Sequence, residues 1–198
     1  MAWLNWPNRI TISRIVLVVP FVICLLNLNE PWIGWRYLAI ALFVAMGLSD
    51  ALDGFLARRL QESTPLGRFL DPVGDKLLIV SSVILLSIEA TAVPGFRLPS
   101  WVPVIAIGKD VLTVIGFLLV YAATGQFVLQ PRILGKACTL IQLLMIGYGL
   151  AAPDMAPWLH RPWPILWWLA SAAAIAALVD YVRLGTRFAA EHHARGSM

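Results

Sequence analysis

Four aspartates, Asp50, Asp53, Asp71 and Asp75, interrupt a long run of apolar residues between positions 50 and 75. They are four of the chain's 11 acidic residues, and the segments around them otherwise read as membrane-spanning. Carboxylates at such positions are costly, so a functional site is the default interpretation. On a helix, Asp50 and Asp53 share one face, as do Asp71 and Asp75. If the short polar link between the two segments folds them into a hairpin, all four carboxylates converge.

Carboxylates a few ångströms apart raise one another's pKa until some are protonated or a cation binds. Hard oxygen ligands without a nearby His or Cys favour Mg²⁺ or Mn²⁺ over zinc, and a pair of such ions would balance four negative charges. Two ions would still attract a diphosphate. The neighbouring Arg58, Arg59, Arg68 and Lys76 favour the same ligand, because guanidinium groups bind phosphate oxygens in bidentate fashion. The pattern predicts a metal-dependent site for a diphosphate compound.

The same stretch resembles the CDP-alcohol phosphotransferase family, whose signature is D-x2-D-G-x2-A-R-x8-G-x3-D-x3-D. The chain has every fixed residue of that signature at the right interval: Asp50, Asp53, Gly54, Ala57, Arg58, Gly67, Asp71 and Asp75. A pattern with this many fixed positions is highly specific. The resemblance extends over roughly residues 5–150.

The resemblance implies that a phosphatidyl group passes from CDP-diacylglycerol to an alcohol, with release of CMP. It implies that the four aspartates bind the metal, and that Asp75 is also the catalytic base. The residues that it implies for the CDP site are Asn8, Thr11, Asp50, Gly54, Ala57, Arg58 and Gly67. Asn8 and Thr11 belong to a Pro-Asn-x2-Thr-x2-Arg motif that ends at Arg14. The alternative interpretation of that motif is a helix N-cap followed by a snorkelling arginine.

The acceptor alcohol is a separate question. The stretches PNRITISR and LGRFLDPVGDKLL are similar to phosphatidylglycerophosphate synthases, which implies glycerol 3-phosphate as the acceptor. The stretches KDVLTVIGFLLVY and QPRILGKACTLIQ also resemble cardiolipin synthases, which implies phosphatidylglycerol. Phosphatidylinositol-phosphate synthase is a more distant alternative. The chain departs from phosphatidylglycerophosphate synthases at Gly74, where Ala is usual, and at Lys109-Asp110, where an Arg-Glu pair is usual. We favour glycerol 3-phosphate.

Three further cations are candidates for a pocket that binds the acceptor phosphate: Lys109, Arg132 and Lys136. Arg132 and Lys136 lie four residues apart on one helical face, and the family resemblance implies that this segment borders the site. The alternative for them is anchoring at the membrane surface. The alternative for Lys109 is that it and the adjacent Asp110 form a structural ion pair between helices.

Composition makes the chain an integral membrane protein. Of its 198 residues, 60% are hydrophobic and 13% are charged, and the mean hydropathy is +0.79. The net charge of +4 reflects membrane topology rather than binding to nucleic acid. Cys24 and Cys138 lie in separate apolar runs and are expected to be packing residues. The family resemblance implies a homodimer.

Hydropathy predicts one all-α membrane domain over residues 1–198, a bundle of six transmembrane helices. The expected parts are an amphipathic segment at 1–9, spans at about 10–28, 37–59, 69–91, 101–122, 134–152 and 163–184, and a polar tail at 185–198. The first span is expected to be retained rather than cleaved as a signal peptide. Asp71-Pro72 either begins the third helix or lies inside a helix that began near Gly67.

The basic residues predict the orientation of the bundle through the positive-inside rule. With a cytoplasmic N-terminus, the cytoplasmic side carries Arg9, Arg58, Arg59, Arg68, Arg132, Lys136, Arg183, Arg187 and Arg195, against Arg36, Arg97 and Arg161 outside. The aspartates then lie near the cytoplasmic face of what we expect to be a bacterial inner membrane. Soluble phosphorylated substrates are available on that side.

Proteins of two other classes also use intramembrane aspartates. A cation transporter would place them along an ion pathway, usually distributed over repeats, and a prenyltransferase would carry two separated acidic motifs. The chain shows no convincing second copy of the aspartate motif. Both alternatives are therefore less consistent with the sequence than a phosphatidyl transferase that acts on membrane lipids.

Overall fold

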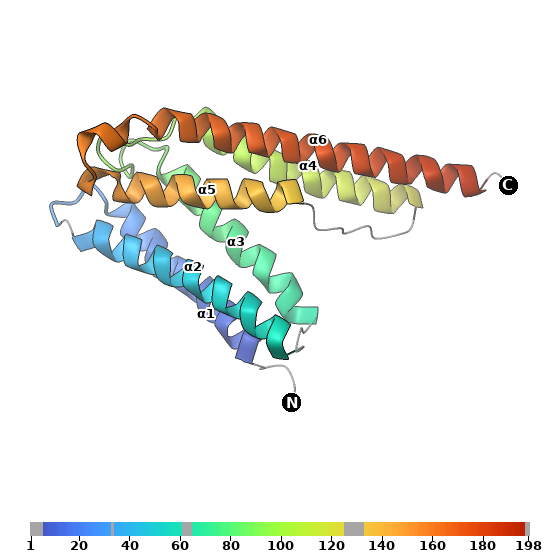
Figure 1. Ribbon diagram of the computed structural model, residues 1–198, viewed down its shortest axis with the longest axis horizontal. Helices are drawn as coiled ribbons and strands as arrows, with labels where there is room; N and C mark the ends of the chain where they lie inside the picture. Colours follow the sequence, from blue (N-terminus) through green and yellow to red (C-terminus); the bar gives the residue numbers. More distant parts are fainter. Residues whose placement is uncertain (1–5, 33, 61–64, 125–132, 197–198) are drawn as a thin grey trace. The chain divides into compact units, whose positions relative to one another are not determined.

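The structure, a computed structural model, describes residues 6–32, 34–60, 65–124 and 133–196, with side chains placed at 12–32, 34–50, 72–122, 124 and 133–186. The described residues form six α-helices and two short 3₁₀ helices and contain no strand (Figure 1). The helices are α1 (Trp6–Leu26), α2 (Gly34–Leu60), α3 (Pro65–Leu85), α4 (Trp101–Thr124), α5 (Ile133–Ala151), η1 (Ala152–Asp154), η2 (Pro157–His160) and α6 (Trp163–Gly196). The predicted all-α class is confirmed.

Three stretches of the described chain are long and apolar enough to cross a bilayer: Trp101–Ala122, Ile133–Asp154 and Pro157–Thr186. A shorter apolar stretch, Ile12–Leu26, lies in α1. These segments support an integral membrane protein. The count of six spans stays a prediction, because α2 and α3 combine their apolar residues with the charged aspartate motif.

Helix α3 ends at Leu85, before the predicted limit of 91. The Thr91 hydroxyl donates a hydrogen bond to the Leu85 carbonyl at 2.6 Å, and the Ser87 hydroxyl donates to the Ile84 carbonyl at 2.7 Å. The Leu98 amide then donates to the Leu86 carbonyl at 2.9 Å. Side chains and a returning loop thus satisfy carbonyls that a longer helix would have bonded internally.

The other helix boundaries answer the question about Asp71-Pro72 and move two expected segment boundaries. Helix α3 begins at Pro65, so Pro72 lies inside a helix that has already started, and Asp71 is not its N-cap. Helix α1 begins at Trp6, so the last residues of the expected amphipathic segment are continuous with the first helix. Residues 1–5 lie outside the described chain. Helix α6 continues through the expected polar tail as far as Gly196.

The described helices form two compact units. The first unit contains α1, α2 and α3, the loop as far as Leu98, and Ile146–His160. Within it, α1 packs against both α2 and α3, which can be followed as the dark blue, cyan and green helices of Figure 1. Each of the three helices buries apolar side chains, among them Phe21 of α1, Met46 of α2 and Ile79 of α3, and the rings of Phe21 and Phe43 bring α1 against α2 with centroids 6.2 Å apart. Helix α1 is therefore the element against which the two aspartate-bearing helices are positioned.

The second unit contains α4, α5 as far as Met145, and α6. Helices α4 and α6 pack side by side along their lengths (Figure 1). A buried cluster joins Cys138 of α5 to Ala174 and Ala177 of α6. Cys138 is thus a packing residue, and neither it nor Cys24, which is buried in the first unit, forms a disulfide. Whether the chain is one membrane domain stays a prediction.

Candidate active site

Arg14 of α1 joins the two aspartate-bearing helices at a single point. Its Nη1 atom lies 2.6 Å from Asp50 Oδ1 of α2 and 3.2 Å from Asp75 Oδ1 of α3. The longer of these contacts is also a hydrogen bond that Arg14 donates to Asp75. Two carboxylates that are 25 positions apart in the sequence therefore converge on one nitrogen, as the predicted hairpin requires.

Close packing between α1 and α3 permits this approach. Gly74 precedes Asp75 and faces α1: a β-carbon built there would lie 3.4 Å from Ile15 Cγ1 and 4.0 Å from Arg14 Cδ. A methyl group would fit at this distance, but a side chain longer than that of alanine would have to displace α1. The small volume at position 74 thus helps to bring the Arg14 guanidinium within reach of Asp75.

Burial differs sharply between the cation and its two partners. Arg14 is 1% exposed, whereas the side chains of Asp50 and Asp75 are 51% and 33% exposed. The guanidinium therefore lies on the protein side of the carboxylates, and the carboxylates remain accessible on their other side. Hard oxygen ligands that are close together and accessible are what Mg²⁺ or Mn²⁺ requires, so the two described carboxylates fit such an ion.

The other two expected metal ligands lie one helical turn away. Asp53 follows Asp50 by three residues in α2, and Asp71 precedes Asp75 by four residues in α3. Both backbones are helical, but their side chains lie outside the part of the chain where side chains are placed. Among the placed side chains, no three His, Cys, Asp or Glu residues gather as a metal site would. The four-aspartate site stays a prediction, of which the structure brings two members together.

The residues expected to bind CDP also lie on these three helices. Asn8 and Thr11 are in α1, and Gly54, Ala57 and Arg58 are in the last two turns of α2. Gly67 is in the first turn of α3. Their side-chain positions lie outside the described set, so their role in binding CDP stays a prediction. Asp50, which also belongs to this group, is the one member whose side chain the structure places.

The three candidates for the acceptor phosphate lie at α4 and at the start of α5. Lys109 is 6% exposed, and its Nζ atom lies 2.7 Å from Asp110 Oδ1 and 3.8 Å from Cys138 Sγ. The Lys109 and Asp110 side chains form an ion pair with each other within α4, whereas the expected structural ion pair lay between helices. Lys136 is exposed in the first turn of α5, and Arg132 lies outside the described residues. None of these observations tests the acceptor pocket, which stays a prediction.

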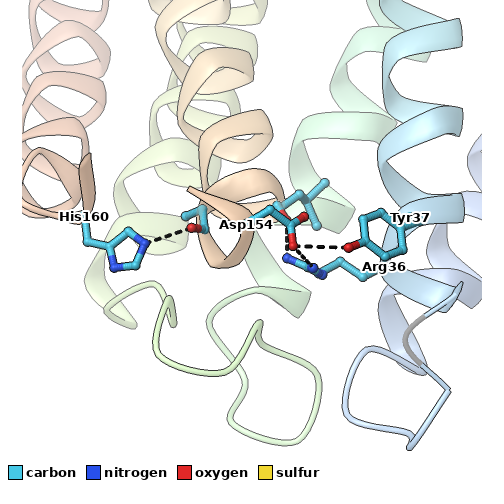
Figure 2. Close-up of polar contacts among 6 residues, drawn as sticks. Arg36, Tyr37, Asp154 and His160 are labelled. Atoms are coloured by element: carbon cyan, nitrogen blue, oxygen red, sulfur yellow. Dashed lines mark hydrogen bonds and ion pairs between the residues drawn. The ribbon is translucent and has the colours of Figure 1, made fainter. Parts of the chain in front are cut away.

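A second polar cluster, at the beginning of α2, was not predicted from the sequence (Figure 2). Arg36 Nη2 donates to Asp154 Oδ1 at 2.6 Å, and the Tyr37 hydroxyl donates to the same oxygen at 3.2 Å. His160 Nε2 lies 2.9 Å from the Ala152 carbonyl oxygen. The contacts of Arg36 and Tyr37 with Asp154 hold α2 against the segment that follows α5 in the first unit, and the His160 contact lies within that segment. About 21 Å of helix separates Arg36 from Asp50, so this cluster is structural rather than part of the candidate site.

The contact between Arg14 and the two aspartates was also missed. The sequence did mark Arg14 as a cation inside an apolar span, and such a cation needs a partner. The need for a partner could have predicted an ion pair between Arg14 and an aspartate. It could not have shown which aspartates, because the partners depend on the rotation of α1 against α2 and α3.

The site can now be compared with known proteins. A sequence model described as CDP-alcohol phosphatidyltransferase matches residues 4–182 of the chain. This match covers the aspartate motif, all three candidate acceptor cations and most of α6. It therefore includes residues from both compact units.

Individual relatives agree with this family. The chain is 34% identical to a CDP-diacylglycerol–glycerol-3-phosphate 3-phosphatidyltransferase of Bacillus subtilis, over 72% of this chain and 75% of that protein. It is 32% identical to a protein of the same name from Pseudomonas fluorescens, over 82% of this chain and 92% of that protein. It is also 32% identical to a CMP-forming cardiolipin synthase of Oryza sativa, over 91% of this chain and 57% of that protein. The chain belongs to the CDP-alcohol phosphatidyltransferase family, and with its long apolar helices it is an integral membrane transferase of phospholipid biosynthesis.

Proposed function

We propose that the protein transfers a phosphatidyl group from CDP-diacylglycerol to glycerol 3-phosphate, giving phosphatidylglycerophosphate and CMP. The convergence of Asp50 and Asp75 on one buried cation is the observation that carries the proposal. It brings the two halves of the family motif together on neighbouring helices. Two of the relatives described above are named for this reaction.

The family is generally dependent on a divalent metal. In this proposal Asp50, Asp53, Asp71 and Asp75 hold two Mg²⁺ or Mn²⁺ ions. Bound metal would neutralise the diphosphate and stabilise the charge that develops on the leaving CMP. The oxygen-only donor set and the exposure of the described carboxylates support this assignment.

The chain's own residues have three tasks in the reaction. Arg58 and the backbone near Gly54 and Gly67 bind the CDP portion. Asp75 accepts the proton of the acceptor hydroxyl as its oxygen forms a bond to the lipid-side phosphorus. The bond from that phosphorus to the bridging oxygen breaks, and CMP leaves with this oxygen. Water must be kept from the same phosphorus, and within this proposal α1, which packs against α2 and α3, closes the protein side of the site.

The acceptor phosphate is assigned to Lys109, Arg132 and Lys136. Lys136 is exposed, as a residue that meets a soluble ligand must be. Lys109 is buried against Asp110 and Cys138, so within this proposal it contributes positive charge behind the pocket. Glycerol 3-phosphate carries a dianionic phosphate, which a cluster of cations favours over a neutral alcohol.

A second candidate is a CMP-forming cardiolipin synthase, with phosphatidylglycerol as the acceptor. The specific support is the relative of that name from Oryza sativa, which matches 91% of this chain. Both reactions use the same donor and release the same nucleotide. They differ only in the acceptor, so the acceptor is what an experiment must vary.

The experiment is an acceptor panel. Purified protein is incubated with CDP-diacylglycerol and Mg²⁺ or Mn²⁺, with glycerol 3-phosphate, phosphatidylglycerol or inositol phosphate offered separately. CMP release is followed, and the lipid product is identified by mass spectrometry. We expect CMP release and phosphatidylglycerophosphate with glycerol 3-phosphate. Cardiolipin formed from phosphatidylglycerol at a higher rate would establish the second candidate, and no CMP release with any acceptor would refute both.

The proposal extends to the cell. The protein acts as a homodimer in a bacterial cytoplasmic membrane, with its site facing the cytoplasm. Bacterial relatives and the excess of basic residues predicted on that side support this placement. Glycerol 3-phosphate and CMP are both water-soluble and enter or leave on the same side.

A further inference from the structure

Arg14 is a fully buried cation inside an apolar helix. Its exposure is 1%, and it lies within Ile12–Leu26, the apolar stretch of α1. A charge in such a place is expensive unless it is paired and hydrogen-bonded. Arg14 forms ion pairs with Asp50 at 2.6 Å and with Asp75 at 3.2 Å, on two different helices. The charge of Arg14 is therefore directed at the candidate metal ligands.

Without metal, the carboxylates of Asp50 and Asp75, which both lie within 3.2 Å of Arg14 Nη1, would repel each other. One guanidinium within hydrogen-bonding distance of both carboxylates offsets that repulsion and ties α2 to α3 through α1. A divalent ion at the same carboxylates would offset it as well. The guanidinium and the ion carry the same sign, so each one weakens the binding of the other to the carboxylates.

We propose that Arg14 is a positioning residue that holds Asp50 and Asp75 together in the metal-free enzyme and competes with the divalent ion for them. The inference rests on the proposed function, because it takes these aspartates to be metal ligands. It predicts that Arg14 stabilises the metal-free protein, and that its positive charge limits the affinity for metal. A purely structural arginine would stabilise the protein equally with and without metal.

The chain offers a matched control in Arg36. Like Arg14, Arg36 is a buried arginine of the first unit, 8% exposed, with a carboxylate 2.6 Å away, in this case Asp154. It lies at the opposite end of α2 from Asp50, about 21 Å away along the helix. Loss of Arg36 removes a buried ion pair without touching the candidate metal ligands.

The experiment compares wild type with Arg14→Gln, Arg14→Lys and Arg36→Gln in detergent. Unfolding temperature is measured in EDTA and at saturating Mn²⁺, and the dissociation constant for Mn²⁺ alone is measured by titration. We expect Arg14→Gln to unfold at a lower temperature than wild type in EDTA, and to recover most of this loss in Mn²⁺. Its Mn²⁺ affinity should rise about tenfold, equivalent to about 1.4 kcal/mol of additional stabilisation by bound metal.

The two other variants separate an effect of Arg14 on metal binding from a general loss of stability. Lysine keeps the charge but cannot present the same fork to both carboxylates, so the metal-induced rise in unfolding temperature should increase in the order wild type, Arg14→Lys, Arg14→Gln. If Arg14→Gln does not fold, the comparison between Arg14→Lys and wild type carries the test. Arg36→Gln should unfold at a lower temperature in both conditions and keep the wild-type response to Mn²⁺.

The inference is overturned if the Arg14 variants show the same Mn²⁺ affinity and the same metal-induced shift as wild type. Weaker Mn²⁺ binding in Arg14→Gln would also overturn it, because Arg14 would then be preorganising the metal site rather than competing for it. The inference is also overturned if Mn²⁺ changes the unfolding temperature of none of these proteins, because the aspartates would then not bind the ion. CMP release by the wild-type protein, measured separately, shows whether the proposed function survives any of these outcomes.

Discussion

At the scale of single residues, the Arg14 guanidinium lies at different distances from the two described aspartates. Asp50 lies 2.6 Å from the guanidinium, and Asp75 lies 3.2 Å from the same nitrogen. Both carboxylates therefore form an ion pair with the same guanidinium nitrogen. That Asp75 rather than Asp50 is the catalytic base stays a prediction from the family motif.

Replacing Asp75 by asparagine tests that role. Asparagine keeps the shape of the side chain and can still accept a hydrogen bond from Arg14, but it cannot take a proton from the acceptor hydroxyl. We expect CMP release to fall at least 100-fold, within the usual range of about 10²–10⁴ for loss of a general base. Circular dichroism and the unfolding temperature should show that the protein remains folded.

The matched control for this variant is Asp154→Asn. Asp154 also pairs with a buried arginine, at 2.6 Å, but it lies in the cluster of Figure 2, away from the candidate site. Its loss should lower the unfolding temperature and leave CMP release close to the wild-type rate. Near-normal turnover in Asp75→Asn would remove Asp75 from the base role.

Lys136 tests the acceptor pocket. It is exposed in the first turn of α5, where a cation could meet a soluble phosphate. We expect Lys136→Ala to raise the KM for glycerol 3-phosphate about tenfold and to leave kcat unchanged, because such a contact contributes equally before and during the reaction. The control is Arg161→Ala, which removes another exposed cation of the second unit. An unchanged KM in Lys136→Ala would exclude this residue from the pocket.

At the scale of helices, Gly74 sets how closely α3 approaches α1. A β-carbon at this position would lie 3.4 Å from Ile15 Cγ1, which is ordinary van der Waals contact. Alanine also favours a helix over glycine by about 0.8–1 kcal/mol. We therefore expect Gly74→Ala to raise the unfolding temperature and to retain CMP release, which agrees with alanine being usual here in the phosphatidylglycerophosphate synthases that the chain resembles.

Gly74→Leu provides the opposing case. Its branched side chain cannot fit against Ile15 without moving α1 away from α3, and Arg14 would move with α1. We expect loss of stability and of activity together, measured by unfolding temperature and CMP release. Wild-type behaviour of Gly74→Leu would show that the close approach of these helices is not needed for the site.

The helix ends show what could be predicted locally and what could not. Helix α4 begins at Trp101, as predicted, because Pro99 interrupts the preceding segment and the apolar run starts at once. The end of α3 at Leu85 was missed because Thr91 and Leu98 satisfy carbonyls near the end of α3 and just beyond it, from six and twelve residues further on. Such contacts depend on the path of a loop, which hydropathy does not describe.

For the candidate site, too, the local features could be predicted from the sequence and the tertiary contacts could not. The spacing of the aspartates follows from the helical repeat, so their placement on one face each could be predicted. The Arg14 contacts depend on how α1 is rotated against two other helices. Contacts between helices accompany that rotation, such as Phe21 with Phe43 and Gly74 close to Ile15, and they join residues far apart in the sequence. The ion pair of Lys109 could be anticipated because Asp110 is its neighbour, whereas its contact with Cys138 of α5 could not.

At the scale of the whole molecule, the reaction joins a lipid dissolved in the bilayer to a water-soluble alcohol. Its site must therefore be accessible from the membrane and from one aqueous side. The family match over residues 4–182 covers both the aspartate motif and the candidate acceptor cations. The positive-inside rule predicts that this aqueous side is the cytoplasm, with nine basic residues expected there and three on the other side.

Membrane vesicles of known sidedness test this orientation. Glycerol 3-phosphate is charged and does not cross a lipid bilayer unaided, so it reaches only sites that face the outside of a sealed vesicle. We expect inside-out vesicles that contain the protein and CDP-diacylglycerol to form phosphatidylglycerophosphate as soon as the acceptor is added. Right-side-out vesicles should remain nearly inactive until detergent opens them, and the two preparations should then have equal rates, which controls for enzyme content. Full activity of sealed right-side-out vesicles would place the site on the outer face, and the arginines and lysines near the motif would need another explanation.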